Sequence, residues 1–338
     1  MKKATLASLA AELKVSRQTI SNVINFPDRV RAETRARVEA AIQRSGYRPS
    51  AAARALRNQR AMAIGVRLSP PRNGISGSFM DAFLREIVTA ADARGYRVVV
   101  FPATSRSDEV ERLLELRGSL AIDGGVLTDT WTDDDRPERL GEAGVPFVSF
   151  GRPWGSADHG AWVDVDGRAG AAAAARFLRD AGHERIGFLG WSDGSPVGAD
   201  RRAGWADELG LTDDDATALT VEGPDTAEAG ASGMARLIDG GATAAVCASD
   251  SLALGAETLR RERGLAGPAV VGFDDTAVAR SMDLTSVRQP VEEVARTALD
   301  LLLERLADPG VTLQGRLVEP VLEVRGQSMS GTRSRASV

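Results

Sequence analysis

Residues 5–25 carry two short helical patterns separated by a tight turn, and this stretch constrains the fold more than any other. The first pattern has an apolar face at helical spacing, formed by Leu6, Leu9, Ala10 and Leu13. The second has an apolar face formed by Ile20, Val23 and Ile24. Thr5 and Ser16 stand where their hydroxyl groups can cap the two helices. The sequence therefore predicts a helix-turn-helix unit near the start of the chain.

The second predicted helix presents a polar face opposite its apolar face. Arginine can pair with guanine, and glutamine or asparagine with adenine, through two hydrogen bonds. We therefore predict that Arg17, Gln18 and Asn22 read base edges. Short polar side chains on or beside this helix suit phosphate oxygens, and these are Ser16, Thr19, Ser21 and Asn25. The alternative is a small helix whose polar face is only solvated, because short patterns of this kind also arise by accident.

The distribution of charge favours nucleic acid as the partner. Residues 1–60 hold 13 Lys and Arg against 4 Asp and Glu, a net charge of +9, whereas residues 61–338 carry a net charge of −14. A basic end on an acidic body is typical of a DNA-binding arm. Because phosphate repels the acidic body, we expect contact with DNA to be confined to the basic end.

Two further helical segments follow the helix-turn-helix pattern. Residues 32–45 predict a third helix, which Gly46 would end and which would complete a three-helix domain. Tyr47-Arg48-Pro49 then forms an extended link. The alanine-rich segment 50–57 is too short to be a stable helix alone, so we expect it to fold when DNA holds it. Leu56 can enter a minor-groove base step as a wedge or be covered by the neighbouring domain, and its spacing favours neither.

Residues 3–60 resemble the DNA-binding headpiece of LacI-type transcriptional regulators, the lactose-repressor family. The matching segments are Thr5-Leu6, Val15-Ser16, Gln18-Thr19-Ile20-Ser21, Val23-Ile24-Asn25, Thr34-Arg35, Gly46-Tyr47-Arg48-Pro49 and Ala53-Arg54-Ala55-Leu56. The resemblance continues to about Arg325 and so covers nearly the whole chain. It implies that Leu56 is the minor-groove lever and that Ala53 lies beside it on the DNA.

Three positions depart from the family pattern. Lys14 stands where the family turn usually has glycine, and Asn22 stands where many members have arginine. Arg31 replaces the usual Ser or Thr cap of the third helix, so the start of that helix is expected to be weaker. Arg31 can instead contact phosphate, and we also predict phosphate contacts from Thr5 and Thr34.

Residues 61–325 alternate short apolar runs with helical patterns, which predicts parallel sheets with helices on both faces. The predicted strands are residues 64–68, 97–101, 125–127, 147–150, 162–165, 186–189, 244–248 and 269–272. The predicted helices include residues 79–94, 167–181, 225–238, 251–263 and 291–306. This length exceeds that of one such lobe, so two lobes are predicted.

The resemblance implies a fold for the whole chain: a small all-α helix-turn-helix headpiece followed by two α/β lobes with doubly wound parallel sheets, as in periplasmic binding proteins. The expected parts are a headpiece in residues 1–49, a hinge helix and linker in 50–60, an effector-binding and dimerisation domain in 61–325, and a disordered tail in 326–338. The first lobe would hold about residues 61–160 and 290–320, and the second about 161–289. Three crossovers would lie near residues 158–162, 286–290 and 317–321. Helix 291–306 would return to the first lobe.

Ligands of doubly wound sheets bind beyond the carboxyl ends of the strands, so polar residues that end apolar strands are candidates for a binding site. These residues are Arg152, Asp164, Asp166, Ser249, Asp250, Asp274 and Asp275. Carboxylate and guanidinium groups bind hydroxyl groups in pairs, and aromatic rings stack on the face of a sugar. The alternative for Asp250 and Asp274 is that each caps a helix.

The resemblance gives effector roles to several residues. Arg201-Arg-Ala-Gly204-Trp205 matches the family's Arg-x-x-Gly-aromatic motif, whose first arginine clamps effector hydroxyl groups. Asp250 and Asp274 carry over from the motifs Ser249-Asp250 and Gly272-Phe273-Asp274-Asp275. Phe79 and Trp191 suit either stacking on a ligand or the apolar core. The predicted effector set is Phe79, Arg152, Asp164, Trp191, Arg201, Asp250, Asp274 and Gln289.

Several classes of function find no support in the sequence. His159 and His183 stand apart from any nucleophile or zinc-ligand pattern, and no phosphate-binding loop or dinucleotide fingerprint is present. We therefore expect no enzymatic activity, no metal and no cofactor. The single Cys247 excludes internal disulfides, and no apolar run is long enough for a membrane span or a secretory signal. A bacterial cytoplasmic protein is expected, associated with the nucleoid when bound to DNA.

These features predict an effector-controlled repressor. A homodimer would place two recognition helices in successive major grooves of a pseudo-palindromic double-stranded operator. The absence of leucine heptads near residue 338 favours a dimer over a larger assembly. A mono- or disaccharide is favoured as effector by the Asp and Arg set and by Trp191 and Trp205. The alternatives are co-repression by a purine or a phosphoprotein, and a sugar-binding protein without gene regulation.

Overall fold

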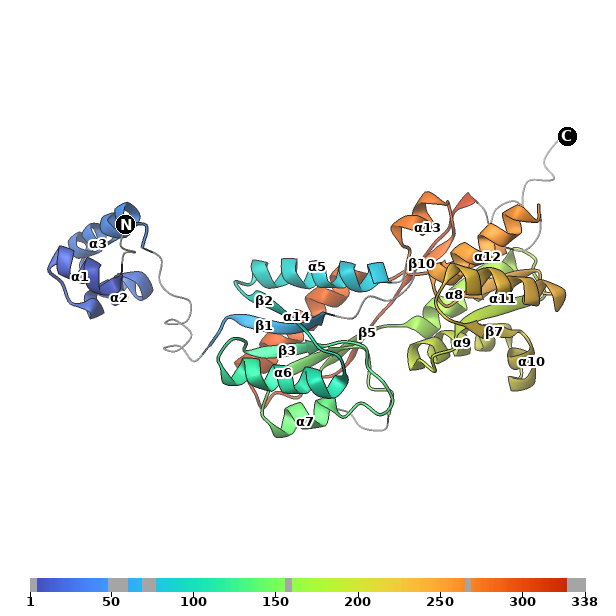
Figure 1. Ribbon diagram of the computed structural model, residues 1–338, viewed down its shortest axis with the longest axis horizontal. Helices are drawn as coiled ribbons and strands as arrows, with labels where there is room; N and C mark the ends of the chain where they lie inside the picture. Colours follow the sequence, from blue (N-terminus) through green and yellow to red (C-terminus); the bar gives the residue numbers. More distant parts are fainter. Residues whose placement is uncertain (1–4, 48–59, 69–76, 156–159, 265–268, 327–338) are drawn as a thin grey trace. The chain divides into compact units, whose positions relative to one another are not determined.

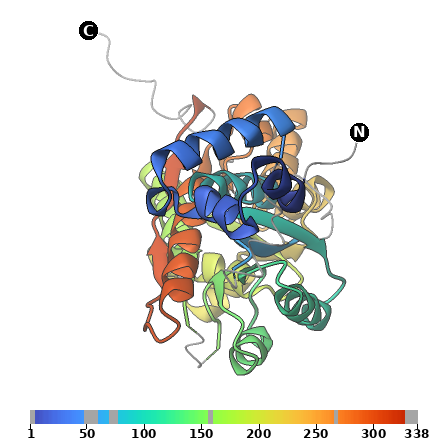
Figure 2. The ribbon, with the colours of Figure 1, turned by 90° about the vertical axis from the view of Figure 1, so that its left-hand side faces the viewer.

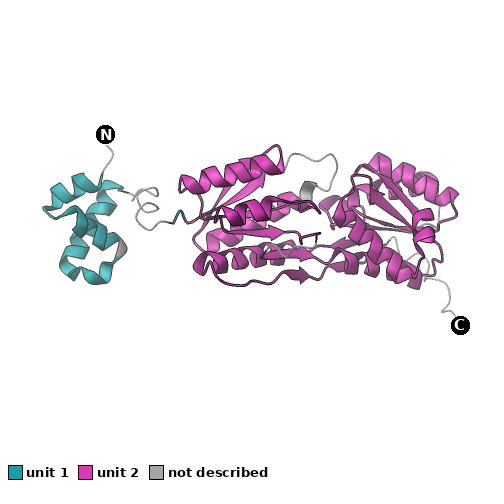
Figure 3. Ribbon diagram, turned by 90° about the horizontal axis from the view of Figure 1, so that it is seen from below, with its two compact units in different colours: residues 1–61 teal, residues 62–338 magenta. Residues whose placement is uncertain are grey.

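The computed structural model describes residues 5–47, 60–68, 77–155, 160–264 and 269–326. The chain forms two compact units, residues 1–61 and residues 62–338 (Figure 3). The predicted hinge segment, with Ala53 and Leu56, lies outside the described residues, as does the tail from residue 327. Among the described residues, no helix is both long and apolar enough to cross a membrane.

The described part of the first unit, residues 5–47 and 60–61, folds into three helices (Figures 1 and 2) that pack around a small apolar core. Its helices are α1 (Leu6–Leu13), α2 (Arg17–Asn25) and α3 (Ala32–Ser45), with the 3-10 turn η1 (Pro27–Arg29) between the last two. The core consists of Leu9, Ala10, Ile20, Val23, Val38 and Ala41. The predicted helix-turn-helix pattern and its apolar faces are thereby confirmed.

The ends of these helices follow the predicted capping residues. The Thr5 hydroxyl accepts a hydrogen bond from the Ser8 backbone amide, and the Ser16 hydroxyl accepts one from the Thr19 amide. Lys14 ends α1 in the left-handed conformation, with φ of 51°, so this chain makes the turn without glycine, at a cost of about 1 kcal/mol. Arg31 provides no side-chain cap for α3, as its residue type predicts.

The second unit begins with a six-stranded parallel sheet in the order β11-β5-β4-β3-β1-β2. The strands are β1 (Ala63–Leu68), β2 (Arg97–Pro102), β3 (Gly124–Leu127), β4 (Phe147–Phe150), β5 (Trp162–Val165) and β11 (Arg316–Val318). Helices α5 (Gly77–Ala93) and α14 (Val291–Ala307) share one core with the sheet, and α6 (Arg106–Gly118) and α7 (Arg136–Glu142) share another. Helix α14 therefore returns to the first lobe, as predicted.

A second six-stranded sheet, in the order β12-β10-β9-β8-β6-β7, builds the other lobe. Its strands are β6 (Ile186–Trp191), β7 (Thr220–Gly223), β8 (Ala244–Cys247), β9 (Ala269–Phe273), β10 (Ser286–Arg288) and β12 (Val321–Glu323). Its helices are α8 (Gly167–Asp180), α9 (Pro196–Leu209), α10 (Asp213–Ala218), α11 (Ala227–Asp239), α12 (Asp250–Glu262) and α13 (Ala277–Ser281). Only the β10–β12 pair is antiparallel among these strands, so the predicted parallel, doubly wound architecture is confirmed.

Three connections join the two lobes. The first follows β5, because β5 pairs with β4 and β11 in the first sheet. The predicted position near residues 158–162, and the assignment of residues 162–165 to the second lobe, are therefore wrong. A strand and its crossover have the same extended, apolar sequence pattern, so the pattern did not show in which sheet this strand pairs. The other connections, after β10 and between β11 and β12, fall within the predicted ranges.

A close helix contact places the first residue of the Arg-x-x-Gly-aromatic motif. Helix α9 packs directly against α8 at Gly204, where a Cβ atom would lie 2.0 Å from the carbonyl oxygen of Arg168. Only glycine permits this approach. Trp205 on the same helix is fully buried against Phe188, with ring centroids 5.5 Å apart. Gly204 and Trp205 thus fix the helix that carries Arg201.

Candidate functional site

The polar face of α2 is the candidate nucleic-acid interface. Arg17 and Gln18 are exposed and Asn22 is half-buried. The side-chain amide of Gln18 donates a hydrogen bond to Asn22 Oδ1 over 2.9 Å, so two of the predicted base-reading residues are held together. Such a pair can present donors and acceptors to base edges with little loss of side-chain freedom on binding.

Five of the seven predicted phosphate contacts lie at the beginnings of the three helices, whereas Ser21 lies in the middle of α2 and Asn25 at its end. Thr5 and Ser16 are exposed caps, and the hydroxyl groups of Ser16 and Thr19 are 2.9 Å apart. Ser21 and Thr34 are half-buried, and Arg31 is exposed. Asn25 belongs to α2, but its side chain lies outside the described residues. Helix beginnings suit phosphate because their free amide groups and dipoles attract anions.

The second unit contains a cleft of about 570 Å³ between its two sheets. Its lining follows the carboxyl ends of strands in both lobes, as expected for doubly wound sheets. Seven of the eight predicted effector residues line it: Phe79, Arg152, Asp164, Trp191, Arg201, Asp274 and Gln289. The sequence prediction therefore brought together residues that lie far apart in the chain.

Arg201 of α9 is the most deeply embedded cation of the cleft, with 5% of its surface exposed. Its Nη1 donates a hydrogen bond to the carbonyl oxygen of Ala248 and lies 3.8 Å from Asp274 Oδ1. The guanidinium group packs over the rings of Phe273 and Trp191, at 3.6 and 5.2 Å from their centroids. Within the described structure its Nε is buried without a hydrogen-bond partner. A buried unpaired donor is costly, so this atom suits a ligand oxygen.

Asp274 lies beside Arg201 and has an altered proton affinity. Burial raises the pKa of its carboxyl group to about 8, although the nearby Arg201 charge opposes this shift. Its Oδ1 accepts a hydrogen bond of 2.6 Å from Gln289 Nε2. The carboxyl group therefore takes up a proton more readily than an exposed aspartic acid, and its protonated form can donate as well as accept a hydrogen bond at a ligand hydroxyl group.

Arg152 connects the two lobes across the cleft. Its Nε donates to Asp164 Oδ2 of β5 over 2.7 Å, and its Nη2 lies 3.3 Å from Asp200 Oδ2 of α9. Burial raises the pKa of Asp164, and the hydrogen bond from Arg152 opposes this. The guanidinium group also lies 4.8 Å from the centroid of the Trp154 ring. One arginine thus contacts carboxylates of both lobes.

The prediction that Asp250 binds the effector is wrong. Its carboxylate does not line the cleft, and it is 1% exposed. Both oxygens are occupied: Oδ1 accepts from the Ser286 hydroxyl and Oδ2 from the Thr276 amide, each over 2.6 Å. Asp250 holds the turn after β9 that carries Asp274, so its role is to position a cleft residue. Burial raises its pKa to about 6.

Sequence reasoning missed several cleft residues. They are Asp129, Trp131, Trp154, Asp193, Asp200 and Asp225. Asp129 lies two residues after the end of β3, so the strand-end argument could have found it. Asp225 follows β7, a four-residue strand that the apolar pattern did not reveal. Among the described residues, no group of three His, Cys, Asp or Glu side chains is arranged to hold a metal ion.

Comparisons with known proteins match both units of the chain. The family model described as bacterial regulatory proteins, lacI family, matches residues 5–50, and the periplasmic binding protein-like domain matches residues 175–328. An uncharacterised HTH-type transcriptional regulator of Streptomyces limosus, from the aml 5′ region, is 35% identical over 96% of this chain and 94% of its own length.

Two solved structures resemble the whole chain. A transcriptional regulator CelR–cellobiose complex is 30% identical with a TM-score of 0.68, covering 95% of this chain and 99% of that one. The lac repressor dimer bound to operator and an anti-inducer is 25% identical with a TM-score of 0.82, covering 97% and 99%. The chain therefore belongs to the LacI family of bacterial transcriptional regulators, in which a helix-turn-helix headpiece precedes a periplasmic-binding-protein-like domain, and it is a DNA-binding regulator rather than an enzyme.

Proposed function

We propose that this regulator is a repressor that leaves its operator when a neutral sugar binds in the cleft. The observation that carries this proposal is the make-up of the cleft, in which aromatic rings lie beside carboxyl and guanidinium groups. The Nε atoms of Arg201 and the Trp191 indole are buried donors without partners in the described structure, which suits ligand hydroxyl oxygens. A mono- or disaccharide fits a cleft of this size, and one relative has been solved with cellobiose.

Binding to DNA is assigned to the first unit. Arg17, Gln18 and Asn22 of α2 would read bases, and Ala53 and Leu56 of the hinge segment would contact the minor groove. The phosphate contacts would come from Thr5, Ser16, Thr19, Ser21, Asn25, Arg31 and Thr34. The protein would act in the cytoplasm, where its operator is accessible.

A homodimer is the proposed DNA-binding form. Exposed apolar side chains occur on both lobes, with Val88 on α5 and Val100 on β2 of the first, and Val278 on α13 of the second. Single exposed apolar side chains are common on monomers, so the support for a dimer comes from a relative, the lac repressor, which has been solved as a dimer bound to its operator. Two copies would match the two halves of a pseudo-palindromic operator.

Ligand binding would alter DNA binding by changing the angle between the two lobes. Arg152 contacts Asp164 in one lobe and Asp200 in the other, so a ligand beside it changes the balance of contacts that holds the lobes at a given angle. A ligand shifts such an equilibrium only if it binds the two arrangements with different affinity.

Thermal unfolding in the presence of mono- and disaccharides and of purines tests the ligand class. At least one neutral sugar should raise the melting temperature of the wild type. Arg201→Ala should abolish this rise, because it removes the buried donor. Arg202→Ala is the matched control, since Arg202 bonds Thr217 and Thr220 and does not line the cleft. A rise with purines alone, or an unchanged rise in Arg201→Ala, would contradict the proposal.

A further inference from the structure

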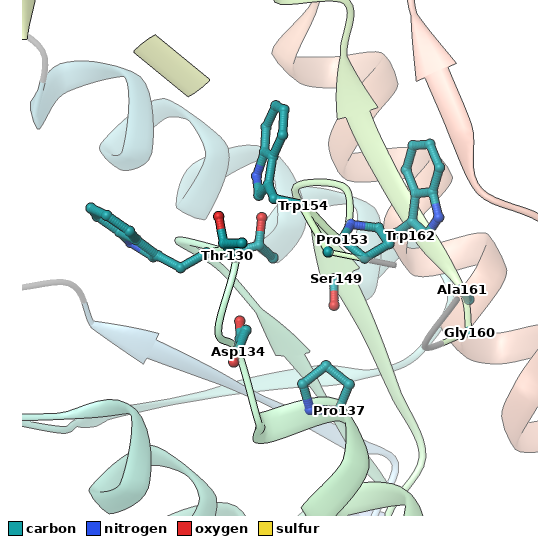
Figure 4. A pocket seen from close by; sticks show the side chains of 12 residues that line it. Thr130, Asp134, Pro137, Ser149, Pro153, Trp154, Gly160, Ala161 and Trp162 are labelled. Carbon is teal, nitrogen blue, oxygen red and sulfur yellow. The ribbon is translucent and has the colours of Figure 1, made fainter. Parts of the chain in front are cut away.

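A second cavity of about 370 Å³ lies beside the cleft within the first lobe (Figure 4). We call it the side cavity, and its described lining is Thr130, Trp131, Thr132, Asp134, Pro137, Ser149, Pro153, Trp154, Gly155, Gly160, Ala161 and Trp162. Thr130, Trp131 and Trp154 also line the cleft, so the two spaces meet at these three residues. The two spaces are therefore neighbours that share part of their lining.

The junction between the two spaces is held in place by contacts of the protein itself. Thr130 Oγ1 donates a hydrogen bond to the carbonyl oxygen of Arg152 over 2.9 Å, which ties the loop after β3 to the loop after β4. The guanidinium group of Arg152 lies over the Trp154 ring, and that of Arg106 lies 5.2 Å from the Trp131 ring centroid. Both indoles are thus oriented before any ligand arrives.

The junction also carries an unused donor. The indole Nε1 of Trp154 is buried and has no hydrogen-bond partner in the described structure. Buried indole N–H groups usually find an acceptor, so this one suits an oxygen of a molecule that passes between the cleft and the side cavity.

The lining of the side cavity has an aromatic side chain on one side and polar side chains on the other. Figure 4 shows Trp162 and Gly160 on one side, Thr130 and Asp134 on the opposite side, and Pro137 below. Asp134 is held by Arg136 through two bonds, of 2.8 Å from Nε and 2.6 Å from Nη2, and its oxygens keep further lone pairs for hydroxyl donors. An apolar lining with a few placed polar groups and a volume above about 300 Å³ is typical of a small-molecule site.

We propose that the side cavity is a binding subsite for further rings of a neutral oligosaccharide whose first rings occupy the cleft. Trp162 would stack on the apolar face of an added ring, and Trp154 would donate to an oxygen at the junction. This inference rests on the proposed sugar-binding function and extends it to chain length: sugars longer than a disaccharide bind more tightly than shorter ones.

Calorimetric titration of the full chain with neutral glucose oligosaccharides tests the subsite. The probes are two series, β-1,4-linked and α-1,4-linked, from one to five rings. In at least one series the wild type should gain about tenfold in affinity when rings are added beyond the second. Trp162→Ala should remove that gain and leave the affinity for the shortest bound sugar unchanged. Trp191→Ala, in the cleft alone, should weaken every length.

A second variant, which fills the side cavity with a larger side chain, tests the subsite even if Trp162→Ala folds poorly. Thr132 is exposed and lines only the side cavity, so Thr132→Trp should fold normally and block the subsite. It should lose the same gain with chain length. Equal affinity for all lengths in the wild type, or a gain that persists in both variants, would overturn the subsite while leaving the cleft proposal intact. Failure of every neutral sugar to bind would overturn both.

Discussion

Arg201 and Asp274 show how burial alters the chemistry of single residues. Arg201 lies 3.8 Å from Asp274 Oδ1, yet both groups are almost completely shielded from water. Burial lowers the pKa of the arginine and raises that of the aspartic acid, because each charged form loses its hydration. Within the described residues, Arg201 Nε has no hydrogen-bond partner, and a hydrogen bond from it to a polar ligand would stabilise the pair.

The buried carboxyl group of Asp274 predicts a pH dependence of stability. Its pKa is about 8 in the folded protein and about 4 in an unfolded chain. Between these values the folded protein keeps a proton that the unfolded chain releases, so raising the pH favours unfolding. Asp274→Asn keeps an oxygen for Gln289 and removes the titration. From pH 5 to pH 8, urea unfolding should show the variant gaining stability relative to the wild type, whereas a constant difference would contradict the assignment.

Many relatives have arginine at the position of Asn22. We therefore expect the operator preference of this protein to differ from theirs most at the base pair that Asn22 contacts. Asn22→Ala should weaken binding to the preferred operator by about 1–3 kcal/mol and relax specificity at one base pair in each half-site. Gln43→Ala, exposed on α3 and outside the predicted interface, is the control. Binding measured on a set of single-base operator variants checks this. An unchanged preference at every base pair would remove Asn22 from the reading surface.

At the scale of elements, a buried ion network joins four segments of the first lobe. It consists of Arg67 on β1, Glu109 on α6, Asp129 after β3, and Asp134 and Arg136 around the start of α7. Arg136 and Glu109 are fully buried, with Arg136 Nη1 donating to Glu109 Oε2 over 2.6 Å. Asp129 lines the cleft and Asp134 lines the side cavity, so the network supports the walls of both.

Breaking this network should destabilise the second unit strongly. Burial raises the pKa of Glu109, and the two arginines oppose this shift. Glu109→Gln removes a buried carboxylate that pairs with both Arg67 and Arg136, which should cost about 3–5 kcal/mol of unfolding free energy. Arg112→Ala on the same helix is the control: it breaks only surface ion pairs and should cost less than about 1 kcal/mol. Equal, small losses in the two variants by urea unfolding would contradict the role of the network.

Most long elements could be predicted from the sequence, and most of the misses have one cause. Strands such as β1, β4 and β9 are mainly apolar runs, so their pattern is strong. β10, β11 and β12 have three residues each, which is too short for the pattern to show, and β7 (Thr220–Gly223) has a single apolar residue, Val221. β5 was found as a strand, but its sheet depends on partners far away in the sequence.

The candidate site residues can be divided in the same way, into those that a strong strand pattern reveals and those whose position depends on distant parts of the chain. Residues that end strong strands, such as Arg152 and Asp274, were found because the strand-end argument holds for both lobes. Asp250 also follows a strand, yet its side chain forms hydrogen bonds inside the lobe. The sequence position of such a residue does not show whether its side chain points into the cleft or into the lobe. The side cavity depends on loops after β3 and β4, whose path the sequence does not reveal.

At the scale of the whole molecule, the two units differ in net charge and in the surface that each provides for binding. Residues 1–60 carry a net charge of +9 and the remainder −14. The basic unit has the polar α2 face, and the acidic unit has the cleft, so binding of DNA and of ligand use separate surfaces. The coupling free energy between DNA binding and ligand binding depends on the whole chain, and it is roughly 1–3 kcal/mol in allosteric proteins.

The affinity of the full chain for its operator, measured with and without sugar, tests this coupling most directly. An operator selected from random duplexes and labelled for fluorescence anisotropy gives the Kd. A saturating sugar that raises the melting temperature should raise the Kd of the wild type by roughly 5- to 150-fold. Arg201→Ala should bind the operator equally with and without that sugar. A wild-type Kd that stays unchanged or falls when the cleft is saturated would contradict the proposed repressor released by sugar.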